Sequence, residues 1–188
     1  MSILKFENRT PRNLQKMYKY LCNPQKTNIY GIFGIGLNPM AAVADMKFMQ
    51  NLYGQHRLTH EYFQVIFTFD KGLFLDIFKA REICIKIGEV LITDKRQVFG
   101  AIHYLNKDAQ KMHCHYLINY VGTDGSLYRQ KYSVYHYRNL INGILKEYGL
   151  NPVESISQNK EDSGGNVYYE EFEDYNSSTE YDYFFGVY

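Results

Sequence analysis

Hydrophobic residues recur along this chain with two different periods, which predict a mixture of strands and helices. Period-two alternation and short apolar runs predict strands over residues 2–8, 62–69, 97–104 and 112–121, and a strand or extended loop over 29–37. Helical periodicity predicts helices over residues 10–21, 38–53, 73–90 and 134–148. The chain should therefore fold from both kinds of element.

Turn-forming residues add the connections between these elements. Asn23-Pro24 should end the first helix, and Gly149 stands where a glycine commonly follows a helix end. The turn signal over residues 122–125 predicts that 112–121 pairs as a hairpin with a further strand over 126–133. Hairpin strands mixed with helices predict an α+β fold on a largely antiparallel sheet, and not a doubly wound parallel one.

Charge divides the chain into two segments of opposite sign. Residues 1–150 carry 20 Lys and Arg against 11 Asp and Glu, a net charge of +9. Residues 151–188 carry one against nine, a net charge of −8, and are rich in Ser, Asn, Gly and Tyr with little apolar periodicity. We therefore expect one basic folded domain over 1–150, followed by an acidic, tyrosine-rich, mobile tail.

The composition limits the classes of protein to which this chain can belong. The 188 residues are 45% hydrophobic and 16% aromatic, which suits a folded domain with a proper core. No basic-then-apolar leader opens the chain, and no apolar run approaches the roughly 18 residues of a membrane span. Three cysteines without CxxC spacing fit reduced thiols. We expect a cytoplasmic protein that does not enter a membrane.

Three histidines carry the clearest chemical signal. If residues 112–121 form a strand, His113 and His115 share one face while Cys114 points to the other. A tight antiparallel pairing with the preceding strand would bring His103 beside them. Three imidazoles leave coordination positions open for a substrate oxygen, as a catalytic metal requires. A lone His-x-His pair more often lies on a solvated polar surface. The third histidine makes a metal site the favoured interpretation.

The same residues resemble a known signature. His113-Cys114-His115 is similar to the motif of HUH endonucleases, and His103, His113, His115 and Asn119 together resemble the narrower relaxase pattern. Independently, the helix predicted over residues 10–21 and the Asn-Pro-Gln-Lys-Thr turn after it resemble the relaxase helix that carries a nucleophilic tyrosine. Tyr20 stands in the nucleophile's position. The resemblance covers residues 1 to about 150.

This resemblance implies a function. A relaxase nicks one DNA strand by tyrosine transesterification, leaves a 5′-phosphotyrosyl intermediate, and serves plasmid mobilisation or conjugative transfer. It would use a divalent ion, Mn²⁺ or Mg²⁺, on a sandwich of sheet and flanking helices. Its partners would be single-stranded DNA at an origin of transfer and accessory mobilisation proteins. Lys19, Lys26, Lys107 and Lys111 are the expected phosphate contacts, with simple solvation as the equal alternative.

The choice of nucleophile rests on the resemblance. Tyr18 and Tyr20 lie about 200° apart on a helix, so only one of them can face the metal. Both flank the predicted apolar stripe of the helix, and helical geometry therefore leaves the choice open.

One departure from the relaxase pattern keeps other interpretations in view. Many relaxases place an acidic residue two positions after the first metal histidine, where this chain has Leu105. The absence of the acidic residue would either lower activity or move its supporting role to Asn106 or Asp108. A replication-initiator or transposase HUH nuclease is one alternative, although the N-terminal tyrosine argues against it. A catalytically degenerate DNA-binding relative is another. A small-molecule metallohydrolase is a third, and it would not need the basic body.

Overall fold

The computed structural model describes residues 2–7, 13–58, 60–70, 73, 75–92, 95–104, 112–128 and 133–153. The strands are β1 (Ile3–Glu7), β2 (Ile32–Ile35), β3 (Tyr62–Thr68), β4 (Val98–His103) and β5 (His113–Asn119). The α-helices are α1 (Leu14–Leu21), α2 (Ala42–Leu52), α3 (Ile77–Leu91) and α4 (Val134–Glu147). Two 3₁₀ turns, η1 (Ile29–Gly31) and η2 (Pro39–Ala41), precede β2 and α2.

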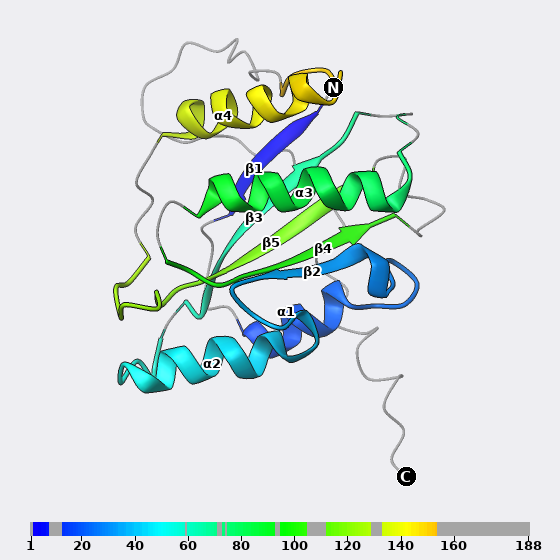
Figure 1. Ribbon diagram of the computed structural model, residues 1–188. Coiled ribbons are helices and arrows are strands. Elements are labelled where there is room, and N and C mark those ends of the chain that lie inside the picture. The colour runs from blue at the N-terminus through cyan, green and yellow to red at the C-terminus, as the bar shows by residue number, and fades with distance from the viewer. Residues whose placement is uncertain are drawn as a thin grey trace, which may run out of the picture. The chain divides into compact units, whose positions relative to one another are not determined.

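The five strands form one sheet in the order β1-β3-β5-β4-β2, and every neighbouring pair is antiparallel. Helices α3 and α4 cover one face of the sheet, whereas α1 and α2 lie against the other (Figure 1). The predicted α+β fold on a largely antiparallel sheet is confirmed.

Two hydrophobic cores result, one on each face of the sheet. Strand β5 shows how the alternation divides its residues, because Cys114, Tyr116 and Ile118 enter the core under α3 and α4. Leu117 points to the other face and enters the core under α1 and α2. Because Cys114 enters the core under α3 and α4, the expectation that it faces away from the histidines is confirmed.

The helix ends follow the local sequence. The Asn13 side chain accepts from the backbone N–H of Lys16 and starts α1, and the Asp76 carboxylate caps the start of α3 in the same way. Helix α3 thus begins at Ile77, later than the expected residue 73. Gly149 follows α4 with a φ of +66°, as expected for a glycine after a helix end.

In the described residues, the predicted hairpin between 112–121 and 126–133 is limited to the residues next to the turn and does not run along β5. Strand β5 is central, with β3 on one edge and β4 on the other, so neither of its edges is available to a third strand. Beyond the end of β5, Val121 pairs antiparallel with Leu127, and the Tyr128 backbone N–H donates to the Tyr120 carbonyl at 2.7 Å. Residues 129–132 of the predicted second strand lie outside the described residues. Tyr128 then stacks on Phe63, with ring centroids 4.4 Å apart.

The folded body continues past the predicted boundary at residue 150. Val153 is 3% exposed, forms a bridge with Ser2, and exchanges hydrogen bonds with the side chain of Asn142. The rest of the predicted mobile tail, residues 154–188, lies outside the described residues. No helix in the described part of the chain is long and apolar enough to span a membrane.

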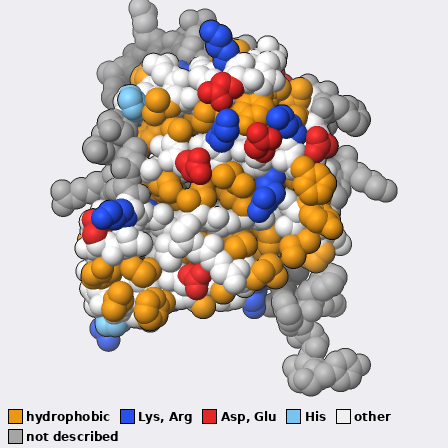
Figure 2. Space-filling view, in the orientation of Figure 1, with side chains coloured by type: hydrophobic (Ala, Val, Ile, Leu, Met, Phe, Trp, Pro, Cys, Tyr) orange, Lys and Arg blue, Asp and Glu red, His pale blue; other side chains and the backbone are white. Residues whose placement is uncertain are grey.

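The face over α3 has mixed charge. Basic and acidic side chains are interspersed there with hydrophobic ones (Figure 2). Lys79 pairs with Glu82 within α3, and Lys86 pairs with Glu147 of α4. This face therefore offers no uniformly basic surface to a polyanion.

Candidate metal centre and tyrosine site

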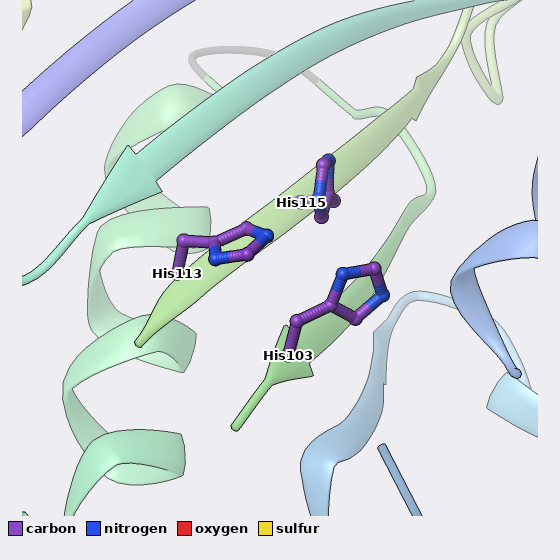
Figure 3. Close-up of side chains that lie close together, drawn as sticks. All are labelled: His103, His113 and His115. Carbon is purple, nitrogen blue, oxygen red and sulfur yellow. The ribbon is translucent and has the colours of Figure 1, made fainter. Parts of the chain in front are cut away.

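The register of β4 and β5 assembles the three histidines. His103 is paired directly with His113, and His115 follows two residues along β5 on the same face. The three rings converge, as Figure 3 shows, and their centroids lie 4.7 to 5.1 Å apart. One nitrogen from each ring lies within 4.8 Å of the others. The predicted cluster thus exists in the fold.

Two of these histidines are buried and held by neutral partners. His103 is 2% exposed, and its Nε2 lies 3.1 Å from the carbonyl oxygen of Leu21 at the end of α1. His115 is 4% exposed, and its Nδ1 lies 3.0 Å from the amide nitrogen of Gln64 on β3. The other nitrogen of His115, Nε2, is buried with no hydrogen-bond partner among the described residues.

Burial keeps the imidazoles of His103 and His115 neutral at neutral pH. Desolvation, reinforced by the neighbouring His113, lowers the pKa of His103 from 6.5 to about 3. Burial also holds the pKa of His115 well below its usual value, and His113, His103, Lys26 and Lys5 act in the same direction. A metal ion would therefore not compete with protons for these two ligands at neutral pH.

The cluster fits a divalent metal ion. Three neutral imidazoles are suitable donors for a divalent transition metal, and they leave further coordination positions open. The buried Nε2 of His115 gives a second reason, because an unsatisfied buried nitrogen is costly and a metal ion would satisfy its lone pair. These features support a metal site without identifying the ion.

Helix α1 brings Tyr20 to this cluster. The Tyr20 ring lies edge-on to the His103 and His115 rings, with centroid distances of 5.9 and 6.4 Å. The Lys26 ammonium lies 3.9 Å from the centroid of the Tyr20 ring. The helix is anchored at both ends, because the Glu61 carboxylate accepts from Leu14 N at 2.7 Å and the Leu21 carbonyl accepts from His103.

Tyr18 faces a different part of the protein. Its hydroxyl donates to the carbonyl of Pro39 at 3.1 Å, and its ring packs on Phe99 at a centroid distance of 5.0 Å. Burial, with a smaller contribution from Cys22, raises the pKa of Tyr18 to about 12. The tertiary structure thus separates two tyrosines that helical periodicity alone did not.

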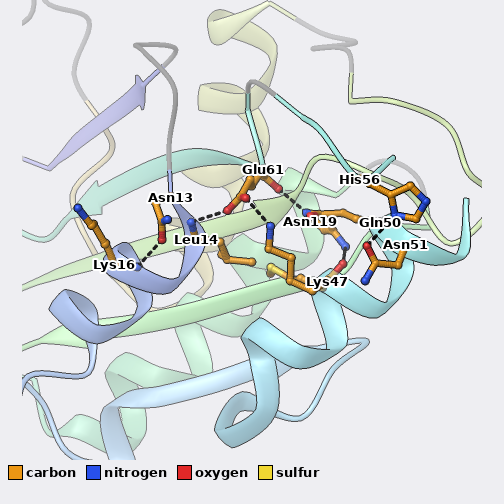
Figure 4. A network of polar contacts seen from close by, with 10 residues as sticks. Asn13, Leu14, Lys16, Lys47, Gln50, Asn51, His56, Glu61 and Asn119 are labelled. Atoms are coloured by element: carbon orange, nitrogen blue, oxygen red, sulfur yellow. Dashed lines mark hydrogen bonds and ion pairs between the residues drawn. The ribbon is translucent and has the colours of Figure 1, made fainter. Parts of the chain in front are cut away.

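Asn119 lies on the histidine face of β5 but away from the cluster. Its amide donates to the Met46 carbonyl and to Gln97 Oε1, and its oxygen accepts from Gln50 Nε2 (Figure 4). It is four residues beyond His115, about 13 Å along the strand. Its contacts join α2 to the sheet, so any supporting role acts through the fold.

The predicted lysines divide into two groups. Lys19 is exposed on α1 next to Tyr20, and Lys26 is partly buried beside the Tyr20 ring. Lys107, Lys111 and Asn106 lie outside the described residues, as do Leu105 and Asp108.

Sequence reasoning missed two residues near the cluster. Gln64 is fully buried in β3, and Lys5 of β1 lies in one cross-strand row with Ile66 and His115. The signal for Gln64 was a single strongly polar residue inside an otherwise apolar strand, because such residues are kept buried only with partners. Nothing local marked Lys5, since its place depends on the strand order.

The fold and the cluster have the parts that the HUH resemblance implies: an antiparallel sheet, three converging imidazoles and a tyrosine from an N-terminal helix. A family model described as "Relaxase: MobA/VirD2-like, nuclease domain" matches residues 20–150. The match covers well over half of the chain, which therefore belongs to the MobA/VirD2-like relaxase nuclease family.

Other comparisons add little. No curated protein matches the chain. A solved structure from a study of the "Molecular Basis of Vancomycin Resistance Transfer in Staphylococcus aureus" is 14% identical, with a TM-score of 0.40 over 58% of this chain. The alignment spans 63% of that chain, less than two thirds of its length.

Proposed function

We propose that this protein is a relaxase that nicks single-stranded DNA by transesterification onto Tyr20. The observation that carries the proposal is the approach of the Tyr20 ring to His103 and His115, with Lys26 against the same ring. The family match to a nuclease domain supports this role. So does the commitment of the competing Tyr18 hydroxyl to a backbone carbonyl.

The reaction balances without a further reactant. The Tyr20 oxygen attacks the scissile phosphorus, the bond to the 3′ oxygen breaks, and the phenolic proton is transferred overall to that oxygen. The products are a 5′-phosphotyrosyl DNA and a free 3′-hydroxyl, so a phosphodiester is conserved and the strand can be rejoined.

The chain's own residues have distinct roles in this scheme. His103, His113 and His115 would hold a divalent ion, Mn²⁺ or Mg²⁺, which when bound supplies Lewis acidity toward the scissile phosphate. Lys26 places a positive charge beside the Tyr20 ring, close to where the scissile phosphate would bind. The anchored ends of α1 hold Tyr20 in position before DNA arrives, so little ordering remains at the moment of reaction.

The substrate would be single-stranded DNA at an origin of transfer, with accessory mobilisation proteins as partners. The net charge of +9 over residues 1–150 suits a phosphate backbone. We place Lys19, Lys26, Lys107 and Lys111 among the phosphate contacts, and the family match supports a role in plasmid mobilisation. A cytoplasmic location agrees with three free cysteines.

A covalent adduct tests the proposal directly. Labelled single-stranded DNA carrying the cognate site is incubated with the protein and Mn²⁺, and the products are separated under denaturing conditions. We expect wild type and Tyr18→Phe to form a protein–DNA adduct. Tyr20→Phe should form none while still binding DNA and metal, because only the phenolic oxygen is lost.

The matched pair of tyrosines makes the result decisive. An adduct in Tyr20→Phe that disappears in Tyr18→Phe would move the nucleophile to Tyr18. Binding of DNA without any adduct in the wild type would instead indicate a degenerate DNA-binding relative. An adduct formed only at a replication origin or a transposon end would favour the alternative HUH nucleases.

A further inference from the structure

Gln64 contacts the candidate metal centre without belonging to it. The residue lies in β3, opposite Leu117 and diagonal to His115, and it is fully buried. Its amide nitrogen is 3.0 Å from His115 Nδ1. It therefore reaches the ring nitrogen of His115 that is opposite to the unpartnered Nε2.

We propose that Gln64 is a positioning residue that selects the metal-binding tautomer of His115, an inference that rests on the proposed metal centre. In the loaded protein, the Gln64 side-chain oxygen accepts a hydrogen bond from His115 Nδ1–H. The lone pair of Nε2 is then directed to the ion. The sheet register that brings β3 beside β5 makes this contact available.

The comparison with His103 shows why His115 needs such a partner. His103 meets a backbone carbonyl, which only accepts, so its Nε2 must carry the proton and its Nδ1 keeps the lone pair. His115 meets an amide, which offers both a donor and an acceptor. Its tautomer is therefore set by which end of the Gln64 amide faces the ring.

The two amide orientations have different consequences for the buried Nε2. With the amide nitrogen toward Nδ1, Nε2 carries a proton that finds no acceptor among the described residues. A half-turn of the amide places its oxygen there, and Nε2 then presents a lone pair that a cation can satisfy. The two ends of the amide have nearly the same shape, so this rotation leaves the volume of the side chain unchanged.

A neutral partner also affects the charge of the site. Within the described part of the chain, no carboxylate hydrogen-bonds to His103 or His115, whose partners are a carbonyl and an amide. Lys26 and Lys5 act on His115 as positive neighbours. The partners of His103 and His115 therefore add no negative charge beside a bound divalent ion.

The test compares Gln64→Leu, Gln64→Glu and the control Gln50→Leu. Gln50 is equally buried and polar, but its side chain bonds Asn119 and the Glu61 backbone, away from the histidines. Zn²⁺ and Mn²⁺ affinities are measured by calorimetry, and folding is checked by thermal melting. Long-range ¹H–¹⁵N spectra of the zinc-loaded protein report which nitrogen of His115 carries the proton.

We expect zinc-loaded wild type to show His115 protonated at Nδ1. Gln64→Leu should lower metal affinity by about 10- to 100-fold, the usual effect of removing an orienting partner. Gln64→Glu should keep both the tautomer and the affinity, because a carboxylate can only accept. Gln50→Leu should bind metal as the wild type does.

Each contrary outcome has a clear meaning. Wild-type affinity in a folded Gln64→Leu protein would overturn the role of Gln64 while leaving the metal centre and the proposed function intact. If Gln64→Leu does not fold, a loss of affinity or an Nε2–H tautomer in Gln64→Glu would overturn it instead. Failure of the wild type to bind either ion would overturn the metal centre itself, and this inference with it.

Discussion

Acidification should destabilise the metal-free protein well above the pH at which carboxyl groups titrate. The pKa of His103 falls from 6.5 to about 3 on folding, chiefly because the ring is buried. Between these two values the unfolded chain binds a proton that the folded protein does not. The free energy of unfolding therefore decreases as the pH falls from 6.5 toward 3.

The size of the effect follows from that shift. Each pH unit below 6.5 lowers the free energy of unfolding by about 1.4 kcal/mol for one such histidine. At pH 5, His103 alone contributes a loss of about 2 kcal/mol, or roughly 4 to 8 °C in Tm for a domain of this size. His115, whose pKa is also lowered by burial, adds to the loss in the same direction.

Urea denaturation in EDTA at pH 7 and pH 5 measures this loss. Carboxyl groups titrate mainly below pH 5, so they contribute little within this window. The variant His103→Gln keeps a side chain able to donate to the Leu21 carbonyl but has no group that titrates, so it should show a smaller loss than the wild type. Equal stability of the wild type at both pH values would refute the argument that these imidazoles are buried and neutral.

Two further predictions concern the metal and the tail. Replacing His113 with alanine should abolish the single Mn²⁺ or Mg²⁺ site, and an unchanged affinity in a calorimetric titration would contradict the three-histidine assignment. Removing residues 154–188, while keeping the buried Val153, should raise affinity for single-stranded DNA at low salt, because the net −8 segment competes for the basic body. The gain should shrink at moderate salt, and no gain at low salt would argue against competition.

Much of the fold and of the candidate metal centre could be predicted from the local sequence pattern. The strand over 112–121 was predictable from its alternation, and with it the shared face of His113 and His115 and the opposite direction of Cys114. The position of His103 beside these two histidines could be predicted by assuming a tight antiparallel pairing of the two neighbouring strands. These features depend on the two-residue period of a strand and on adjacent pairing, and both can be inferred from nearby residues.

The order of the strands in the sheet could not be predicted from the local sequence pattern. The run over 126–133 alternates like a strand, but β5 already has a neighbour on each edge, so the predicted hairpin cannot form along it. One of those neighbours, β3, comes from a segment about fifty residues earlier in the chain. The same pairing brings Gln64 to His115 and Lys5 into the same row.

The two tyrosines show most clearly what only tertiary structure decided. Tyr18 and Tyr20 both flank the apolar stripe of α1. Helical periodicity therefore cannot predict which of the two faces the metal centre. The docking of α1 on the sheet turns Tyr18 toward Phe99 and Pro39 and turns Tyr20 toward the histidines. Local sequence determined that both would lie beside the buried face, whereas contacts with residues distant in the chain determined which one reaches the candidate metal centre.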